Sequence, residues 1–185
     1  GGAACSALYP FRESFYERLG YVTLPQAKRV HLDPAALQPL LQWELGGQVQ
    51  MLPIAEGYDA YRAFLEEHRQ RVHGMALFEP DDRGEALRGD RWLALATVGD
   101  QVEGAMLYDV RGEQIARFNL RANRFYYGSP TGRYLLLEWI ARHIDQAVRV
   151  EIVLPASERP ETWLADLKVR AETASHITPM VRVLD

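Results

Sequence analysis

The chain has 185 residues, of which 48% are hydrophobic and 25% are charged, and its formal net charge is -4. This composition excludes collagen-like, disordered and disulfide-scaffold proteins, and the interspersed charges indicate neither a nucleic-acid surface nor a membrane surface. A single cysteine, the lack of a signal-peptide pattern and the lack of a long apolar run predict a cytoplasmic protein.

The first residues predict a strand and a helix. Residues 3–9 are typical of a short buried strand, in which Cys5 would be an inert buried thiol. Residues 12–19 predict a helix with Phe15 and Leu19 four positions apart on the face toward a core. One short strand and one helix cannot bury enough apolar area to stabilise themselves, so we expect their packing partners elsewhere.

A second strand and helix follow. Residues 21–32 predict a strand in which Pro25 causes a break or an edge position. Asp33 and the proline after it predict the cap and first turn of a helix over 34–41. No periodic pattern crosses residues 42–47, so we expect a boundary between two units there.

The rest of the chain predicts a regular order of elements. We expect a strand, an amphipathic helix, three antiparallel strands, a helix, a strand, a short helix and a last strand, over 49–54, 57–72, 92–98, 102–110, 114–127, 130–145, 148–154, 161–167 and 180–184. Gly99 and Asp100 predict a hairpin between the first two antiparallel strands. In the third strand the small or apolar residues stand at even positions before Asn123 and at odd positions after it, which predicts a β-bulge near this residue. The sequence contains no internal repeat.

Residues 6–21 carry a family resemblance. Their sequence, Ser-Ala-Leu-Tyr-Pro-Phe-Arg-Glu-Ser-Phe-Tyr-Glu-Arg-Leu-Gly-Tyr, resembles the end of a GNAT-superfamily acetyltransferase domain. More narrowly it resembles the Eis-like (enhanced intracellular survival) branch, which combines a catalytic GNAT domain, a degenerate GNAT-like domain and a sterol-carrier-like C-terminal domain. The resemblance implies that residues 1–42 end the first domain, that 48–177 form the second and that 178–185 begin the third.

The fold class follows from this resemblance and from the element order of residues 48–177. We expect an α/β (α+β) fold with a GNAT-like mixed, mostly antiparallel sheet and helices on both faces.

The resemblance also implies a function. It implies an acetyl-CoA-dependent N-acetyltransferase that moves an acetyl group to a primary amine, with Tyr16 as the general acid for the departing thiolate. Phe11 and Arg12 would contact acetyl-CoA. The base would be the C-terminal carboxylate of the last domain, so we expect the 185-residue chain alone to be inactive. The alternatives are that Tyr16 is an ordinary half-buried tyrosine and Arg12 a solvated charge.

Residues 128–132 precede a helix where a GNAT domain would hold the pyrophosphate of acetyl-CoA with backbone N–H groups. They lack the expected glycine spacing, and Pro130 removes one donor. We therefore expect weak cofactor binding by residues 48–177. The alternative function is a non-catalytic GNAT-like scaffold or oligomerisation module.

Other polar residues suggest no further chemistry. His68 and His73 lie on different faces of the predicted helix, and no cysteine or carboxylate cluster completes a zinc set, so we predict no metal. The polar residues along 117–123 predict a solvated or domain-contacting sheet face. We expect acetyl-CoA and an amine as partners, no nucleic acid and no membrane, and the large aromatic residues leave a homo-oligomer open.

Overall fold

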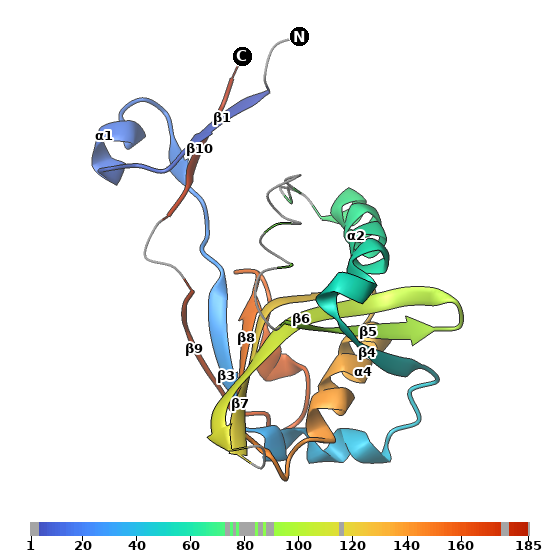
Figure 1. Ribbon diagram of the computed structural model, residues 1–185. Coiled ribbons are helices and arrows are strands. Elements are labelled where there is room, and N and C mark those ends of the chain that lie inside the picture. The colour runs from blue at the N-terminus through green and yellow to red at the C-terminus, as the bar shows by residue number, and fades with distance from the viewer. Residues whose placement is uncertain are drawn as a thin grey trace.

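Figure 1 shows a computed structural model in which a small sheet stands apart from a larger body, and both chain ends lie at the small sheet. The structure describes residues 4–72, 75, 77, 84, 87, 91–114, 117–174 and 178–184. None of the helices in these ranges has the length and apolar character needed to cross a membrane.

The body is built on a seven-stranded sheet with the strand order β4-β5-β6-β7-β8-β3-β9. The strands are β3 Lys28–Leu32, β4 Gln48–Pro53, β5 Trp92–Val98, β6 Gln101–Gln114, β7 Arg117–Tyr127, β8 Ala147–Leu154 and β9 Val169–Thr173. Only the neighbours β7 and β8 run parallel; the other neighbouring pairs are antiparallel. The predicted mixed, mostly antiparallel sheet is confirmed.

Helices cover both faces of this sheet, as expected (Figure 1). Helix α4 (Pro130–Ala141) and the 3-10 helix η1 (Pro34–Gln42) pack on one face and bury the larger core cluster. Helix α2 (Ile54–Arg71) packs on the other face, where Tyr58, Tyr61 and Leu65 contact apolar residues of β5 and β6. A predicted short helix over 161–167 is reduced to the 3-10 turn η2 (Pro160–Thr162).

Local sequence signals are confirmed at the helix starts and at the bulge. The Asp33 carboxylate accepts a hydrogen bond from the Ala35 amide at 3.0 Å and caps η1. In β7, Ala122 pairs with Tyr108 and Arg124 pairs with Leu107, so one extra residue, Asn123, lies between them. This bulge returns the later residues of β7 to the face of the larger core.

The position of β3 shows which of the two expected effects Pro25 has, and it corrects the predicted boundary. Val30 is fully buried and pairs with Ile152 of β8 on one side and Ala171 of β9 on the other. Pro25 does break the predicted strand, but β3 is an interior strand and not an edge. Residues 28–42 share one apolar core with 48–173, so the predicted boundary at 42–47 lies inside the body.

The small sheet has the order β1-β10-β2, from β1 (Cys5–Leu8), β10 (Met180–Val183) and β2 (Val22–Thr23), and it carries the short helix α1 (Glu13–Glu17). The expected burial of Cys5, Phe15 and Leu19 is wrong in this structure: Cys5 is exposed, and Phe15 and Leu19 are 43% and 48% exposed. Three short strands and a helix of five residues are too small to enclose a core.

The two sheets share one local arrangement that the sequence does not reveal. In the body, β8 and β9 flank η2 in the chain, and β3 pairs antiparallel between them. In the small sheet, β1 and β2 flank α1 in the chain, and β10 pairs antiparallel between them. In the chain, β3 follows the β1-α1-β2 unit of the small sheet, and β10 follows the β8-η2-β9 unit of the body. The two sheets therefore exchange their middle strands.

Candidate functional site

Four aromatic rings gather around α1, with Tyr16 at the centre. The Tyr16 ring lies 5.4 Å from Phe11, 5.2 Å from Phe15 and 5.9 Å from Tyr21, all in edge-to-face arrangements. Such arrangements are the favoured geometry of aromatic pairs. The predicted general acid and the predicted cofactor contact Phe11 therefore lie together.

The hydroxyl groups of the two tyrosines differ. The Tyr21 hydroxyl shares a hydrogen bond with Ser6 Oγ at 2.8 Å. The Tyr16 hydroxyl makes no hydrogen bond to any residue that the structure describes, while the Tyr16 carbonyl accepts from the amides of Leu19 and Tyr21 at 2.9 and 3.2 Å. The backbone of Tyr16 is held in place, and its phenol is free to donate.

Phe11 and Arg12 lie between the end of β1 and the start of α1. The Phe11 side chain is 76% exposed, and Arg12 is also exposed. Arg12 makes no ion pair within the described ranges, although its carbonyl accepts from the Phe15 amide at 3.1 Å. Both side chains are exposed and therefore open to a ligand.

The residues at 128–132 do not fit a diphosphate. The Gly128 amide donates to the Glu103 carbonyl at 2.9 Å, and the Gly132 amide donates to the capping Ser129 Oγ at 3.1 Å. Pro130 has no N–H group. Three of the five residues in this loop therefore offer no amide to a ligand.

A carboxylate also faces the loop. A Cβ placed on Gly128 would lie 3.4 Å from Oε2 of Glu103 and 3.5 Å from a guanidinium nitrogen of Arg71. An anionic ligand at Gly128 would meet the Glu103 charge, which Arg71 offsets only in part because its guanidinium also pairs with Glu67. The loop geometry and the charge both disfavour the phosphate site of a GNAT domain here.

The sequence analysis missed a polar pair at the ends of β7 and β8. The Tyr127 hydroxyl donates to the Glu158 carboxylate. Burial, followed by this hydrogen bond, raises the pKa of Tyr127 to about 12. The Arg133 guanidinium lies over the Tyr127 and Trp163 rings at 5.3 and 5.2 Å from their centroids. Tyr127 and Glu158 are 31 positions apart and belong to no motif, so no sequence signal joins them.

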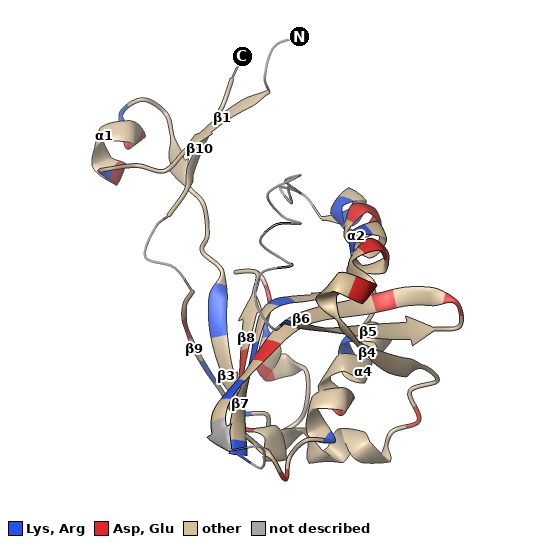
Figure 2. Cartoon of the chain, viewed as in Figure 1, with Lys and Arg blue, Asp and Glu red and all other residues tan. Residues whose placement is uncertain are grey.

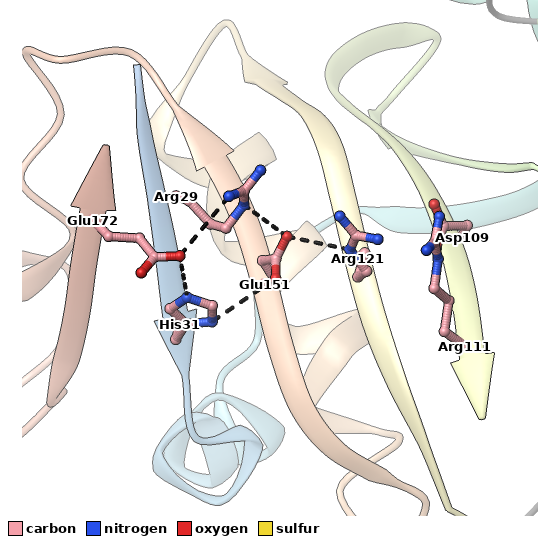
Figure 3. Close-up of polar contacts among 7 residues, drawn as sticks. All are labelled: Arg29, His31, Asp109, Arg111, Arg121, Glu151 and Glu172. Atoms are coloured by element: carbon pink, nitrogen blue, oxygen red, sulfur yellow. Dashed lines mark hydrogen bonds and ion pairs between the residues drawn. The ribbon is translucent and has the colours of Figure 1, made fainter. Parts of the chain in front are cut away.

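Charged residues lie on the strands that α2 leaves open (Figure 2). Their side chains form a network of ion pairs (Figure 3). Glu151 pairs with Arg29 at 2.9 Å and with Arg121 at 3.2 Å. Glu172 lies 3.3 Å from Nε2 of His31, and this hydrogen bond lowers the pKa of Glu172. These ion pairs neutralise much of the charge of this polar face.

Within the described ranges, no group of three histidine, cysteine or acidic side chains could hold a metal ion. His68 is half-buried beside Phe64 and Tyr126, while His73 lies outside the described residues.

No protein-family model matches the sequence, and no curated protein matches it. Solved structures do match. A GCN5-related N-acetyltransferase from Anabaena variabilis has a TM-score of 0.77 at 15% identity, covering 98% of this chain and 46% of that one. A probable N-acyltransferase from Enterococcus faecalis has a TM-score of 0.75 at 16% identity, covering 97% and 45%. Eis1 from Mycobacterium abscessus has a TM-score of 0.68 at 15% identity, covering 98% and 48%.

These likenesses concern the fold. The chain has a GNAT-like fold, and it is structurally similar to GNAT N-acetyltransferases along nearly its whole length. It spans less than half the length of each of these three structures.

Proposed function

We propose that this chain is part of an acetyl-CoA-dependent N-acetyltransferase of the Eis-like type, which transfers an acetyl group to a primary amine with Tyr16 as general acid. The observation that carries the proposal is the free phenol of Tyr16, whose ring is held by its neighbours Phe11 and Tyr21. Acetyl-CoA supplies the activated thioester when it is bound. Tyr16 would hold a proton at the position of the departing sulfur, a task that suits a phenol because free thiols and phenols have neighbouring pKa values.

The internal arrangement of the fold supports the placing of the cofactor contacts. Strand β8 pairs with β3 on one edge and, in parallel, with β7 on the other. Strand β1 takes the corresponding place in the small sheet, but among the described strands it pairs only with β10. If a parallel strand paired with the open edge of β1, it would correspond to β7 beside β8 in the body. Phe11 and Arg12 would then lie where this strand and β1 diverge, as β7 and β8 diverge in the body.

The small sheet also has a bare apolar face. Cys5 pairs with Val183, and Ala7 pairs with Val181, which in turn pairs with Val22, so these five side chains share one face. Val22 and Val183 are 67% and 77% exposed. Exposed apolar faces of this kind mark contact surfaces. We propose that the small sheet completes the catalytic GNAT domain of a longer protein, that residues 28–173 form its second, degenerate GNAT-like domain and that residues 178–185 lead into a third domain.

The test is a pair of tyrosine variants in the longer protein that contains this chain. With acetyl-CoA and a panel of primary amines, Tyr16→Phe should lower kcat tenfold or more at an unchanged melting temperature. The matched variant Tyr21→Phe should keep kcat within about twofold, but it should cost about 1 kcal/mol of stability because it removes the hydrogen bond to Ser6. An unchanged rate in Tyr16→Phe would refute the acid role.

A second candidate function concerns the body by itself. The occupied amides of Gly128 and Gly132 and the carboxylate of Glu103 favour a non-catalytic GNAT-like scaffold for residues 28–173. The two functions are compatible in one protein. Substitutions in the loop at 128–132 that keep the fold should leave acetyl transfer unchanged if the body is a scaffold.

A further inference from the structure

Helix α1, which carries Tyr16, has no buried side chain within the described residues. A helix of five residues is too short to be stable without contacts to the rest of the protein. Its start is tied to β2, because Thr23 donates to the Glu13 carboxylate at 3.0 Å. The position of Tyr16 on the small sheet therefore depends on ring contacts and on hydrogen bonds of this kind.

The turn that ends α1 is hydrogen-bonded directly to Tyr16. The Tyr21 amide donates to the Tyr16 carbonyl at 3.2 Å, and the Gly20 amide donates to the Glu17 carbonyl at 3.0 Å. Gly20 has a left-handed conformation with a φ of 83°. These bonds and this conformation form a Schellman motif, a common end of a helix. Because the turn folds back onto the Tyr16 carbonyl, a displacement of the turn also displaces Tyr16.

The side chain of Arg182 holds this turn against β10. Its Nη1 atom donates to the Leu19 carbonyl at 3.0 Å. The side chain also passes over Gly20, where a Cβ would lie 3.7 Å from Cδ of Arg182. The last carbonyl groups of a helix have no partner within the helix, and a basic side chain can satisfy them. Arg182 is 163 positions away from Leu19, so no local sequence signal joins the two.

A second contact lies beside the first on the same face of the small sheet. Ser6 of β1 is paired with Arg182 of β10, so the two side chains leave the sheet on the same side. Ser6 shares its hydrogen bond with the Tyr21 hydroxyl, and the Tyr21 ring lies 5.9 Å from the Tyr16 ring. Ser6 thus holds a ring beside Tyr16, and Arg182 holds the backbone beside Tyr16.

We propose that Arg182 is a positioning residue for the general acid: it fixes the turn that ends α1 and thereby the place of the Tyr16 phenol. This inference rests on the proposed function, because Arg182 acts on the reaction only through Tyr16. Arg182 belongs to β10, which follows the body in the chain, so the acid is in place only when β10 has joined β1 and β2. A small displacement of a catalytic group lowers the rate steeply.

The experiment is a double-mutant cycle in the longer protein that contains this chain, with acetyl-CoA and a primary amine that the protein acetylates. Arg182→Ala should lower kcat about fivefold and change the KM for acetyl-CoA by less than about twofold. In the Tyr16→Phe background the same substitution should change kcat by less than about twofold, because the group that Arg182 positions is gone. Equal losses in both backgrounds would overturn the proposal, since Arg182 would then act independently of Tyr16.

Further variants separate the donor from the bulk of the side chain. A lysine ammonium can still donate to the Leu19 carbonyl, so Arg182→Lys should keep kcat within about twofold of the wild type. Arg182→Met keeps the aliphatic stem over Gly20 without the donor, and it takes the place of Arg182→Ala if the alanine variant fails to fold. The control Arg149→Ala removes an exposed arginine of β8 and should leave kcat unchanged. Equal losses in Arg182→Lys and Arg182→Ala would refute the positioning role.

A second measurement needs no acetyl transfer. Nuclear Overhauser contacts of the Tyr16 ring with the rings of Phe11 and Tyr21, measured by NMR in the 185-residue chain, should weaken in Arg182→Ala and persist in Arg182→Lys. Wild-type ring contacts in Arg182→Ala would overturn the positioning role and leave the acid role standing. A wild-type kcat in Tyr16→Phe would instead overturn the proposed function, and this inference with it.

Discussion

The backbone of Gly132 packs directly on the backbone of Glu103, so closely that a Cβ on Gly132 would overlap the Glu103 carbonyl group. This contact seats the first turn of α4 on β6. It also brings Glu103 against the loop at 128–132, so the packing that fixes the helix disfavours a phosphate at its start.

Gly132→Ala should therefore destabilise the protein. Alanine is favoured over glycine in a helix by about 1 kcal/mol, but the added methyl group meets backbone atoms that cannot move aside. Overpacking of this kind costs about 1–3 kcal/mol or more, so we expect a net loss of about 2 kcal/mol in urea unfolding. Gly128→Ala is the control, because its Cβ would make only ordinary contacts at 3.4 and 3.5 Å. The control should stay within about 0.5 kcal/mol of the wild type, and equal losses in both variants would contradict the contact.

Two valines test the placement of β3 in the body. Val30→Ala removes fully buried methyl groups between β8 and β9 and should cost about 2 kcal/mol of unfolding free energy. Val183→Ala acts on a side chain that is 77% exposed in the small sheet and should cost less than about 0.5 kcal/mol. A small effect of Val30→Ala on unfolding of the body would restore the predicted boundary at 42–47.

Acetyl-CoA binding to the 185-residue chain tests the loop at 128–132. We expect no binding at acetyl-CoA concentrations up to about 1 mM, which means a binding free energy weaker than about 4 kcal/mol. The reason is that the loop offers few amides and faces Glu103. Calorimetric titration measures this directly. Micromolar binding would mean that the loop holds the cofactor, and the proposed active site would then move from Tyr16 to the body.

The contact between Glu172 and His31 predicts a pH dependence of stability. The hydrogen bond to His31 lowers the pKa of Glu172 from its ordinary value of 4.5. A lowered folded-state pKa stabilises the protein above the unfolded-state pKa, and this stabilisation is lost as the pH falls through the folded-state value. Urea unfolding of the wild type and Glu172→Gln should differ near pH 6, and the difference should disappear as the pH falls from 4.5 through the lowered folded-state pKa.

His31→Ala in the same experiment serves as the matched variant. It removes the hydrogen-bond partner of Glu172 and should abolish most of the pH-dependent difference. A difference that persists in the His31→Ala background would assign the effect to another group.

The sequence by itself determined the elements whose signals are local. The hairpin at Gly99, the bulge at Asn123 and the Asp33 cap of η1 each depend on residues a few positions apart, and each is confirmed. The aromatic cluster at Tyr16 is equally local, because its four rings come from residues 11–21.

Tertiary structure alone decided which strands are neighbours. The residues of β3 read as a strand, but only its pairing with β8 and β9 shows that it lies inside the body. Strand β9 (Val169–Thr173) has too few apolar residues to be predicted, and β3 holds it in place. The pair of Tyr127 and Glu158 depends on the same sheet. Strand partners are far apart in the chain, and the free energy of burying them together is not encoded in any local window.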